Sequence, residues 1–202
     1  MRLGSAVVLA ALGIAMASGP RLHAEALQSP GAASPQPART DGDAGALAAF
    51  RASIDTYLGL RKKISQEIPP LKVTPRAAEI TAASDALARA VQRARPRAAQ
   101  GSFFTPDVAA MLRRRLEQVL RTTDREAVFA LITEEPSATK RPTVHMRFPA
   151  GDVLATTPAV FLETLPPLPS ELEYRFVGTT LVLRDIAAAL ILDYLPDAIK
   201  AR

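Results

Sequence analysis

The sequence predicts an α+β domain in which a helical N-terminal part packs on a small antiparallel sheet. Between residues 44 and 132, apolar residues recur at helical spacing, whereas residues 172–185 alternate like two strands joined by a tight turn. Residues 186–195 are nearly all apolar, which predicts a buried C-terminal helix that closes the core. The same run also fits a strand, because a short apolar run does not settle the period.

Residues 1–24 have the pattern of a secretory signal peptide. Arg2 supplies a positive charge, and residues 6–17 form an apolar run that is too short to span a bilayer, which takes about 20 residues. Leu22-His23-Ala24 is a plausible cleavage site, with Ala15-Met16-Ala17 as its rival, and an uncut anchor is the alternative. The pattern predicts a periplasmic or secreted protein that has no transmembrane helix after cleavage.

Residues 25–43 are rich in Ser, Pro, Ala, Gly and Gln, so we expect a disordered linker there. Residues 44–200 then have the length of a single domain. Within it, the spacing predicts helices over about 44–67, 75–94, 106–121 and 123–135, and a short helix over 158–165. Asp43 is a candidate N-cap for the first of them.

Three of these helices are expected to start with the same device. Thr74-Pro75, Thr105-Pro106 and Thr157-Pro158 each place a capping hydroxyl before a proline at the first helical position. Thr123 and Glu126 form a capping box for the remaining helix. These signals predict where the helices begin.

The clearest strand signal is a hairpin over residues 172–185. Gly178-Thr179 fits a two-residue type II′ loop, whose first position requires positive φ. The resulting register pairs Val177 with Thr180, Phe176 with Leu181, Tyr174 with Leu183, and Glu173 with Arg184 as an ion pair. Residues 143–148 also alternate, with Val144, Met146 and Phe148 on one face, and are a candidate third strand.

The C-terminal half contains the motifs Leu165-Pro-Pro-Leu-Pro, Leu172-Glu-Tyr-Arg-Phe-Val-Gly178, Leu181-Val-Leu-Arg-Asp185 and Leu190-Ile-Leu-Asp193, and Gly101-Ser-Phe-Phe-Thr-Pro106 lies upstream of them. In these motifs the chain resembles an uncharacterised family of exported proteins of Gram-negative bacteria. The resemblance covers most of the mature chain and implies export and one compact domain. It implies no catalytic residues.

Composition excludes several kinds of chemistry. The chain has no cysteine, which excludes disulfides, thiolate metal sites and a cysteine nucleophile. His145 is the only histidine after signal cleavage, so a zinc site would need carboxylates for its other ligands, and we expect no metal. No phosphate loop, dinucleotide fingerprint or Gly-x-Ser-x-Gly elbow is present, so the sequence indicates no cofactor.

His145 is the one candidate catalytic residue. It could act as a general base oriented by Asp152, Glu171 or Asp185, although a half-exposed strand residue is the simpler interpretation. Glu171 and Glu173 point to one face of a strand, as a glycosidase pair would, but Arg184 opposite Glu173 favours a structural ion pair.

Arg113, Arg114 and Arg115 are the densest part of an arginine-rich stretch between residues 89 and 125. They are candidate binding residues for an anionic envelope surface or an acidic partner, and a solvated helix face is the alternative. Nucleic acid is a poor partner, because few aromatic residues accompany the arginines. The sequence therefore favours a non-catalytic envelope protein that binds a partner or an anionic surface; the alternative is a small periplasmic hydrolase that uses His145.

Overall fold

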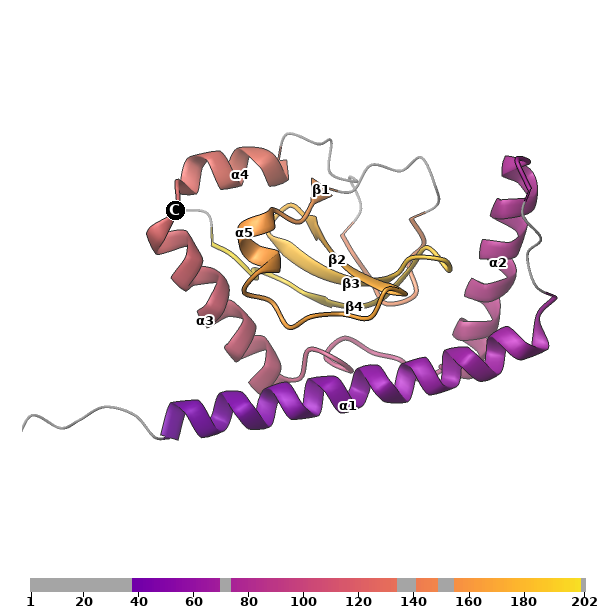
Figure 1. Cartoon of the computed structure of the whole chain (residues 1–202), viewed down its shortest axis with the longest axis horizontal. Helices are drawn as coiled ribbons and strands as arrows, with labels where there is room; N and C mark the ends of the chain where they lie inside the picture. Colours follow the sequence, from indigo (N-terminus) through magenta and orange to yellow (C-terminus); the bar gives the residue numbers. More distant parts are fainter. Residues whose placement is uncertain (1–37, 70–73, 134–140, 149–154, 201–202) are drawn as a thin grey trace, which may run out of the picture. The chain divides into compact units, whose positions relative to one another are not determined.

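The computed structural model describes residues 38–69, 74–133, 141–148 and 155–200. The predicted signal peptide and residues 25–37 of the predicted linker lie outside them. The order of elements is α1 (Ala38–Glu67), α2 (Ala77–Ala94), α3 (Pro106–Thr122), α4 (Arg125–Thr133), β1 (Ala155–Thr156), α5 (Ala159–Leu162), β2 (Leu172–Val177), β3 (Thr180–Asp185) and β4 (Leu190–Leu195). The expected α+β architecture is confirmed: helices pack on a small antiparallel sheet (Figure 1).

Helix α1 is longer than expected. It begins at Ala38, so the expected linker boundary is wrong for residues 38–43, and Asp43 lies inside the helix rather than at its N-cap. Its buried residues, among them Phe50, Ile54 and Tyr57, recur at helical spacing and face the core. Once packing holds a helix in place, adding residues at its end costs little free energy, because each added residue gains a backbone hydrogen bond.

Only one of the three Thr-Pro pairs caps a helix. Thr105 accepts a hydrogen bond from the Val108 amide at the start of α3, as expected. Helix α2 instead begins two residues after Pro75, with no side-chain cap. Thr157 donates its hydroxyl proton to the Tyr174 carbonyl at 2.8 Å, which satisfies a carbonyl on the outer side of β2.

The capping box expected at Thr123 is also displaced. The Asp124 carboxylate caps α4 by accepting from the Ala127 amide at 3.1 Å, whereas Thr123 donates to the Val119 carbonyl at 2.9 Å. None of the described helices is both long enough and apolar enough to cross a bilayer.

The sheet has the strand order β1-β2-β3-β4, and every neighbouring pair is antiparallel. The register predicted for the hairpin is confirmed at each pair, from Val177 opposite Thr180 to Glu173 opposite Arg184. Gly178 has φ +57°, whereas Thr179 has a negative φ, as a type II′ turn requires. The sheet face that carries Tyr174 and Phe176 packs in the same apolar core as the helices.

The predicted closing helix is wrong, and the alternative strand is present. Residues 190–195 form β4, the last strand. Leu190 and Leu192 face the main core, whereas Ile191 and Tyr194 pack in a second apolar cluster on the other face of the sheet. A strand that is buried on both faces has no alternating pattern, which is why the sequence did not distinguish it from a helix.

Residues 143–148 run beside β4 but form no regular strand. The His145 amide donates to the Ile191 carbonyl at 2.8 Å, and Arg147 forms an isolated bridge with Leu190. His145 itself has φ +68°, outside the extended region, so the alternation predicted here is broken at its centre. Met146 and Phe148 still belong to the second cluster, as their expected common face suggests.

A buried aspartate fastens the α2–α3 connection to the sheet. The Asp193 carboxylate is fully buried and accepts hydrogen bonds from the amides of Gly101, Phe103, Phe104 and Tyr194 at 2.7–2.9 Å. Two of the sequence motifs quoted above, Gly101–Pro106 and Leu190–Asp193, therefore meet at this carboxylate.

Candidate functional site

An apolar groove of about 360 Å³ lies where three parts of the fold meet. The first part is the end of α1 with the two residues after it, which contribute Ser65, Ile68 and Pro69. The second part is α2, which contributes Ile80, Thr81, Ala83, Ser84 and Leu87. The third part lies at the sheet: Arg184 comes from β3, Ile186, Ala187 and Ala189 come from the β3–β4 turn, and Arg147 comes from the segment beside β4. The groove is partly open to solvent. It is an apolar cleft of the kind that small ligands or side chains of a partner occupy.

Small side chains on α2 leave the space open. Of the 18 residues of this helix, the fully buried ones are Ala88 and Val91, both in its second half. In the first half, two pairs of alanines, at 77–78 and 82–83, lie on either side of Glu79, Ile80 and Thr81, and alanine side chains are too short to fill the distance to the sheet. The alanine-rich composition of this helix is the sequence signal from which the groove could have been expected.

The turn between β3 and β4 forms the opposite wall, and Asp185 fixes it. One oxygen of the buried Asp185 carboxylate accepts from the Ala188 amide at 2.9 Å within the turn. The other accepts from the Tyr57 hydroxyl and the Arg61 Nε of α1, each at 2.7 Å. The turn is thereby tied to α1.

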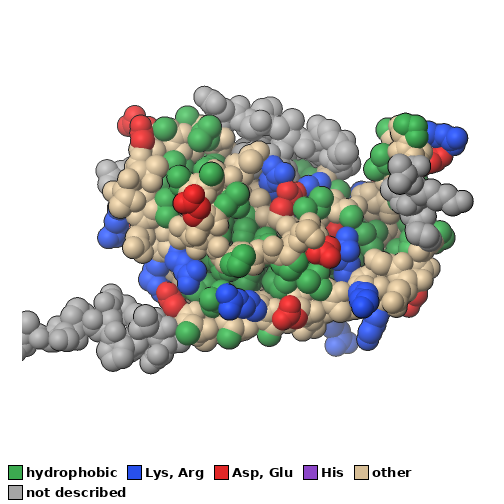
Figure 2. Space-filling model, in the orientation of Figure 1, with side chains coloured by type: hydrophobic (Ala, Val, Ile, Leu, Met, Phe, Trp, Pro, Cys, Tyr) green, Lys and Arg blue, Asp and Glu red, His purple; other side chains and the backbone are tan. Residues whose placement is uncertain are grey.

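Two isoleucines from different elements line this groove. Ile80 of α2 is 45% exposed and Ile186 of the turn is 44% exposed. They are two of four large apolar side chains that are exposed among the described residues, the others being Leu131 and Leu162. Figure 2 shows apolar side chains between the sheet and α2 with charged groups beside them. Such concentrations mark interaction sites more often than single exposed side chains do.

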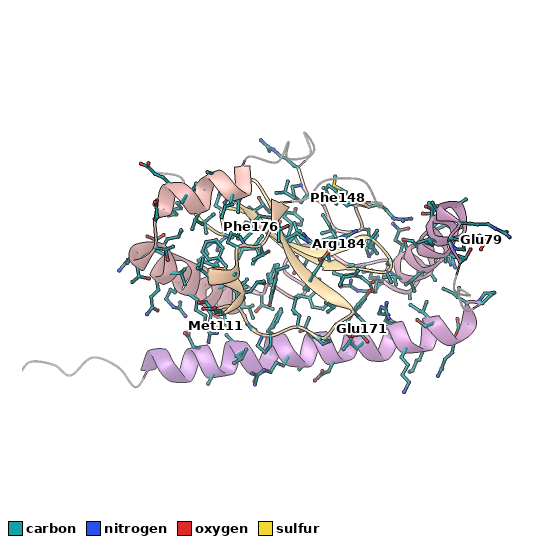
Figure 3. All side chains as sticks on the ribbon, turned by 45° about the horizontal axis from the view of Figure 1, so that its top comes forward. Glu79, Met111, Phe148, Glu171, Phe176 and Arg184 are labelled. Atoms are coloured by element: carbon teal, nitrogen blue, oxygen red, sulfur yellow. The ribbon has the colours of Figure 1, made fainter. Side chains whose placement is uncertain are left out.

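Two arginines supply the polar side of the groove. Arg147 pairs with Asp85 and donates to the Ser84 hydroxyl at 3.1 Å, both on α2. Arg184 pairs with Glu173 at 2.5 Å and donates to the Phe148 carbonyl at 2.8 Å, so that Arg184 and Phe148 lie together over the sheet (Figure 3). In each arginine, Nε is buried and has no hydrogen-bond partner within the described part of the chain.

The ion pair predicted between Glu173 and Arg184 is confirmed, and a second arginine joins it. Arg175 contacts the other oxygen of Glu173 at 2.7 Å. Burial alone would raise the pKa of Glu173, but hydrogen bonds and charges from Arg175 and Arg184 hold this pKa below its ordinary value. Glu173 is therefore a structural carboxylate and not one half of a glycosidase pair with Glu171.

Among the described residues, His145 has no ion pair with a carboxylate that could orient it. Burial lowers its pKa, and the positive charge of Arg95 lowers this pKa further. Of the three acids considered for it, Asp185 is held by Tyr57 and Arg61, and Asp152 lies outside the described residues. The third, Glu171, interacts electrostatically with Arg61.

The backbone of His145 has its own structural role. Its amide bonds to β4, and the Gln92 side chain of α2 donates to its carbonyl at 3.2 Å. These contacts hold its unusual φ, so the strain at His145 follows from its place between α2 and β4.

The three arginines of α3 point to three different parts of the fold. Arg113 donates to the carbonyls of Pro196 and Asp197 at 2.8 and 3.2 Å. Arg114 pairs with Asp43 of α1. Arg115 donates to the Thr164 carbonyl at 3.3 Å. Each of the three guanidinium groups therefore bonds to other atoms of the chain, and none of the three arginines lines the groove.

Comparisons with known proteins add no further assignment. No family model, no curated protein and no solved structure matches this chain. Among the described residues, no group of three His, Cys, Asp or Glu side chains is placed to hold a metal ion. Within the described structure, the groove is the feature that has the form of a ligand-binding site.

Proposed function

We propose that this protein is an exported, non-catalytic binding protein and that the groove between α1, α2 and the β3–β4 turn is its binding site. The observation that carries the proposal is the pair Ile80 and Ile186, which leave apolar surface exposed on both walls of one groove. Covering such surface is favourable by about 25 cal/mol per Å². A ligand or partner with an apolar group gains this free energy by entering the groove.

The chemistry of His145 supports the non-catalytic part of the proposal. A general base that works near neutral pH profits from a carboxylate partner, which raises the pKa of the imidazole. Burial and Arg95 act on His145 in the opposite direction. The hydrolase alternative therefore lacks the charge arrangement that it needs among the described residues.

Export is proposed from residues 1–24 alone. When the full chain is expressed in a Gram-negative host, we expect the protein in the periplasmic fraction to begin at or near Glu25. N-terminal sequencing of that fraction checks this; an intact Met1 on a membrane-bound product would show that the segment is an uncut anchor.

A neutral fluorescent probe tests the groove. N-Phenyl-1-naphthylamine has no charge and becomes fluorescent in apolar sites, so we expect the full chain to enhance its emission. Ile80→Ser and Ile186→Ser should each weaken probe binding several-fold because they remove apolar surface from the groove walls.

Leu131→Ser is the matched control for these variants. Leu131 is 58% exposed on α4 and does not line the groove. Its replacement should leave probe binding unchanged. An equal loss of probe binding in all three variants would refute the groove as the binding site, and so would a wild-type chain that does not enhance the emission of the probe.

A further inference from the structure

We propose that the groove takes a free aliphatic monocarboxylate of medium chain length, with its alkyl chain between Ile80 and Ile186 and its carboxylate at Arg147 and Arg184. This inference rests on the proposed function, because it names the class of ligand for the same groove. Size, the chemistry of the walls and the balance of charge each contribute to it.

The size of the groove sets the length of the ligand. A volume of about 360 Å³ equals that of about a dozen water molecules in the liquid, and a CH₂ group is nearly the same size as a water molecule. A saturated carboxylate of eight to ten carbons therefore fills the groove, with some of its chain exposed because the groove is partly open.

The walls suit an alkyl chain. The apolar residues that line the groove within the described ranges are all aliphatic, namely Ile68, Pro69, Ile80, Leu87, Ile186 and three alanines. A thin flexible chain packs well on branched aliphatic side chains.

The charges beside the groove favour an anion. Arg147 and Arg184 line the groove and pair with Asp85 and Glu173. Glu173 also pairs with Arg175, which does not line the groove, so this group of ion pairs has one positive charge in excess. A single ligand carboxylate balances that charge. An amine would add to the excess, and an alcohol would leave it uncompensated.

Both arginines can turn to the ligand at low cost. If Arg184 leaves Glu173, this carboxylate keeps the 2.7 Å contact with Arg175. The side chain of Asp85 is 37% exposed, so water can replace Arg147 there; the Arg147 side chain is 25% exposed.

Competition against the neutral probe tests the ligand class. Hexanoate, octanoate, decanoate and decanol are added to the full chain with bound N-phenyl-1-naphthylamine, at pH 7 and below the concentrations at which they form micelles. We expect each added CH₂ to lower the half-displacing concentration by about two- to fourfold. Decanoate should displace the probe at a concentration at least about tenfold lower than decanol, because charge-assisted hydrogen bonds hold its carboxylate.

Two further measurements assign that difference to the arginines. Raising the salt concentration should weaken the binding of decanoate but not that of decanol, because salt screens the ion pairs between the carboxylate and the arginines. Arg147→Gln should narrow the gap between the two competitors, whereas Arg141→Gln, at an exposed position that does not line the groove, should leave the gap unchanged.

The outcomes separate the two proposals. Equal displacement by decanoate and decanol, or no displacement by either while the probe binds, overturns the monocarboxylate and leaves the groove as a binding site. Tighter displacement by a short peptide with a C-terminal leucine than by decanoate overturns it in favour of a peptide ligand. If the probe itself does not bind, the proposed function has failed.

Discussion

At the scale of single residues, two buried aspartates determine how the parts of this molecule are joined. Asp185 ties the β3–β4 turn to α1, and Asp193 ties the α2–α3 connection to β4. Both carboxylates are fully buried, and their hydrogen bonds offset the large cost of removing a charge from water. Asp185 holds one wall of the groove, the β3–β4 turn, against α1.

Asp193→Asn should destabilise the fold. The new NH₂ group faces at least one amide that the carboxylate now accepts from, and each buried donor left without an acceptor costs about 1–3 kcal/mol. Thermal unfolding checks this, with a fall of about 2–4 °C expected for each kcal/mol. Asp197→Asn, at an exposed position, is the control; equal melting temperatures for both variants would show that Asp193 is not the clamp described.

The pKa of His145 should lie below 6.5 in the folded protein because burial and Arg95 disfavour the charged imidazole. The unfolded chain then binds the proton more readily, so the free energy of unfolding falls as the pH drops from about 6.5 to the folded pKa. His145→Gln should remove this dependence. An NMR titration measures the pKa directly, and a value above 6.5 would indicate a carboxylate partner and favour the hydrolase alternative.

At the scale of elements, the hairpin was predictable residue by residue, whereas β4 was not. The hairpin has one face in the main core and a glycine at its turn, so its period and register are both visible in the sequence. β4 is buried on both faces, so its sequence does not show the alternation of apolar and polar residues that indicates a strand. The segment at residues 143–148 shows the opposite failure: it alternates, but contacts with α2 and β4 override that pattern at His145.

Gly178→Val should destabilise the hairpin through its backbone alone. Gly178 has φ +57°, and the space around an added Cβ is open, so there is strain but no steric clash with other residues. Placing a side chain in this conformation costs about 1–2 kcal/mol. Gly178→Asn should cost less, because asparagine tolerates positive φ; melting temperatures equal to that of the wild-type chain for both would show that the turn is assigned incorrectly.

Helix α3 joins distant elements through its arginines, and their substitution should have unequal effects. Arg113→Ser leaves the carbonyls of Pro196 and Asp197 without their donors and should lower the melting temperature more than Arg114→Ser does. The side chain of Arg114 is 54% exposed, and exposed pairs contribute at most about 1 kcal/mol. If Arg114→Ser costs no stability but abolishes binding to anionic vesicles, the anionic-surface hypothesis gains over a structural role.

At the scale of the whole molecule, the sequence predicted the class of fold but not the groove. The helical segments, the hairpin and the buried C-terminal run are local patterns, so they could be read along the chain. The groove joins residues of α1, α2 and the β3–β4 turn that are up to about 120 positions apart, and no local pattern reveals that they meet. Arginine density drew attention to α3, where the guanidinium groups bind the chain's own carbonyls and a carboxylate.

The most direct test of this account is an NMR titration of the full chain, labelled at isoleucine and leucine methyl groups, with N-phenyl-1-naphthylamine. The account predicts that the methyl signals of Ile80 and Ile186 shift together and saturate at one ligand concentration. The signals of Leu131 and Leu162, which are as exposed but lie on other elements, should stay in place. Shifts at Leu131 or Leu162 without shifts at Ile80 and Ile186 would contradict the groove as the binding site.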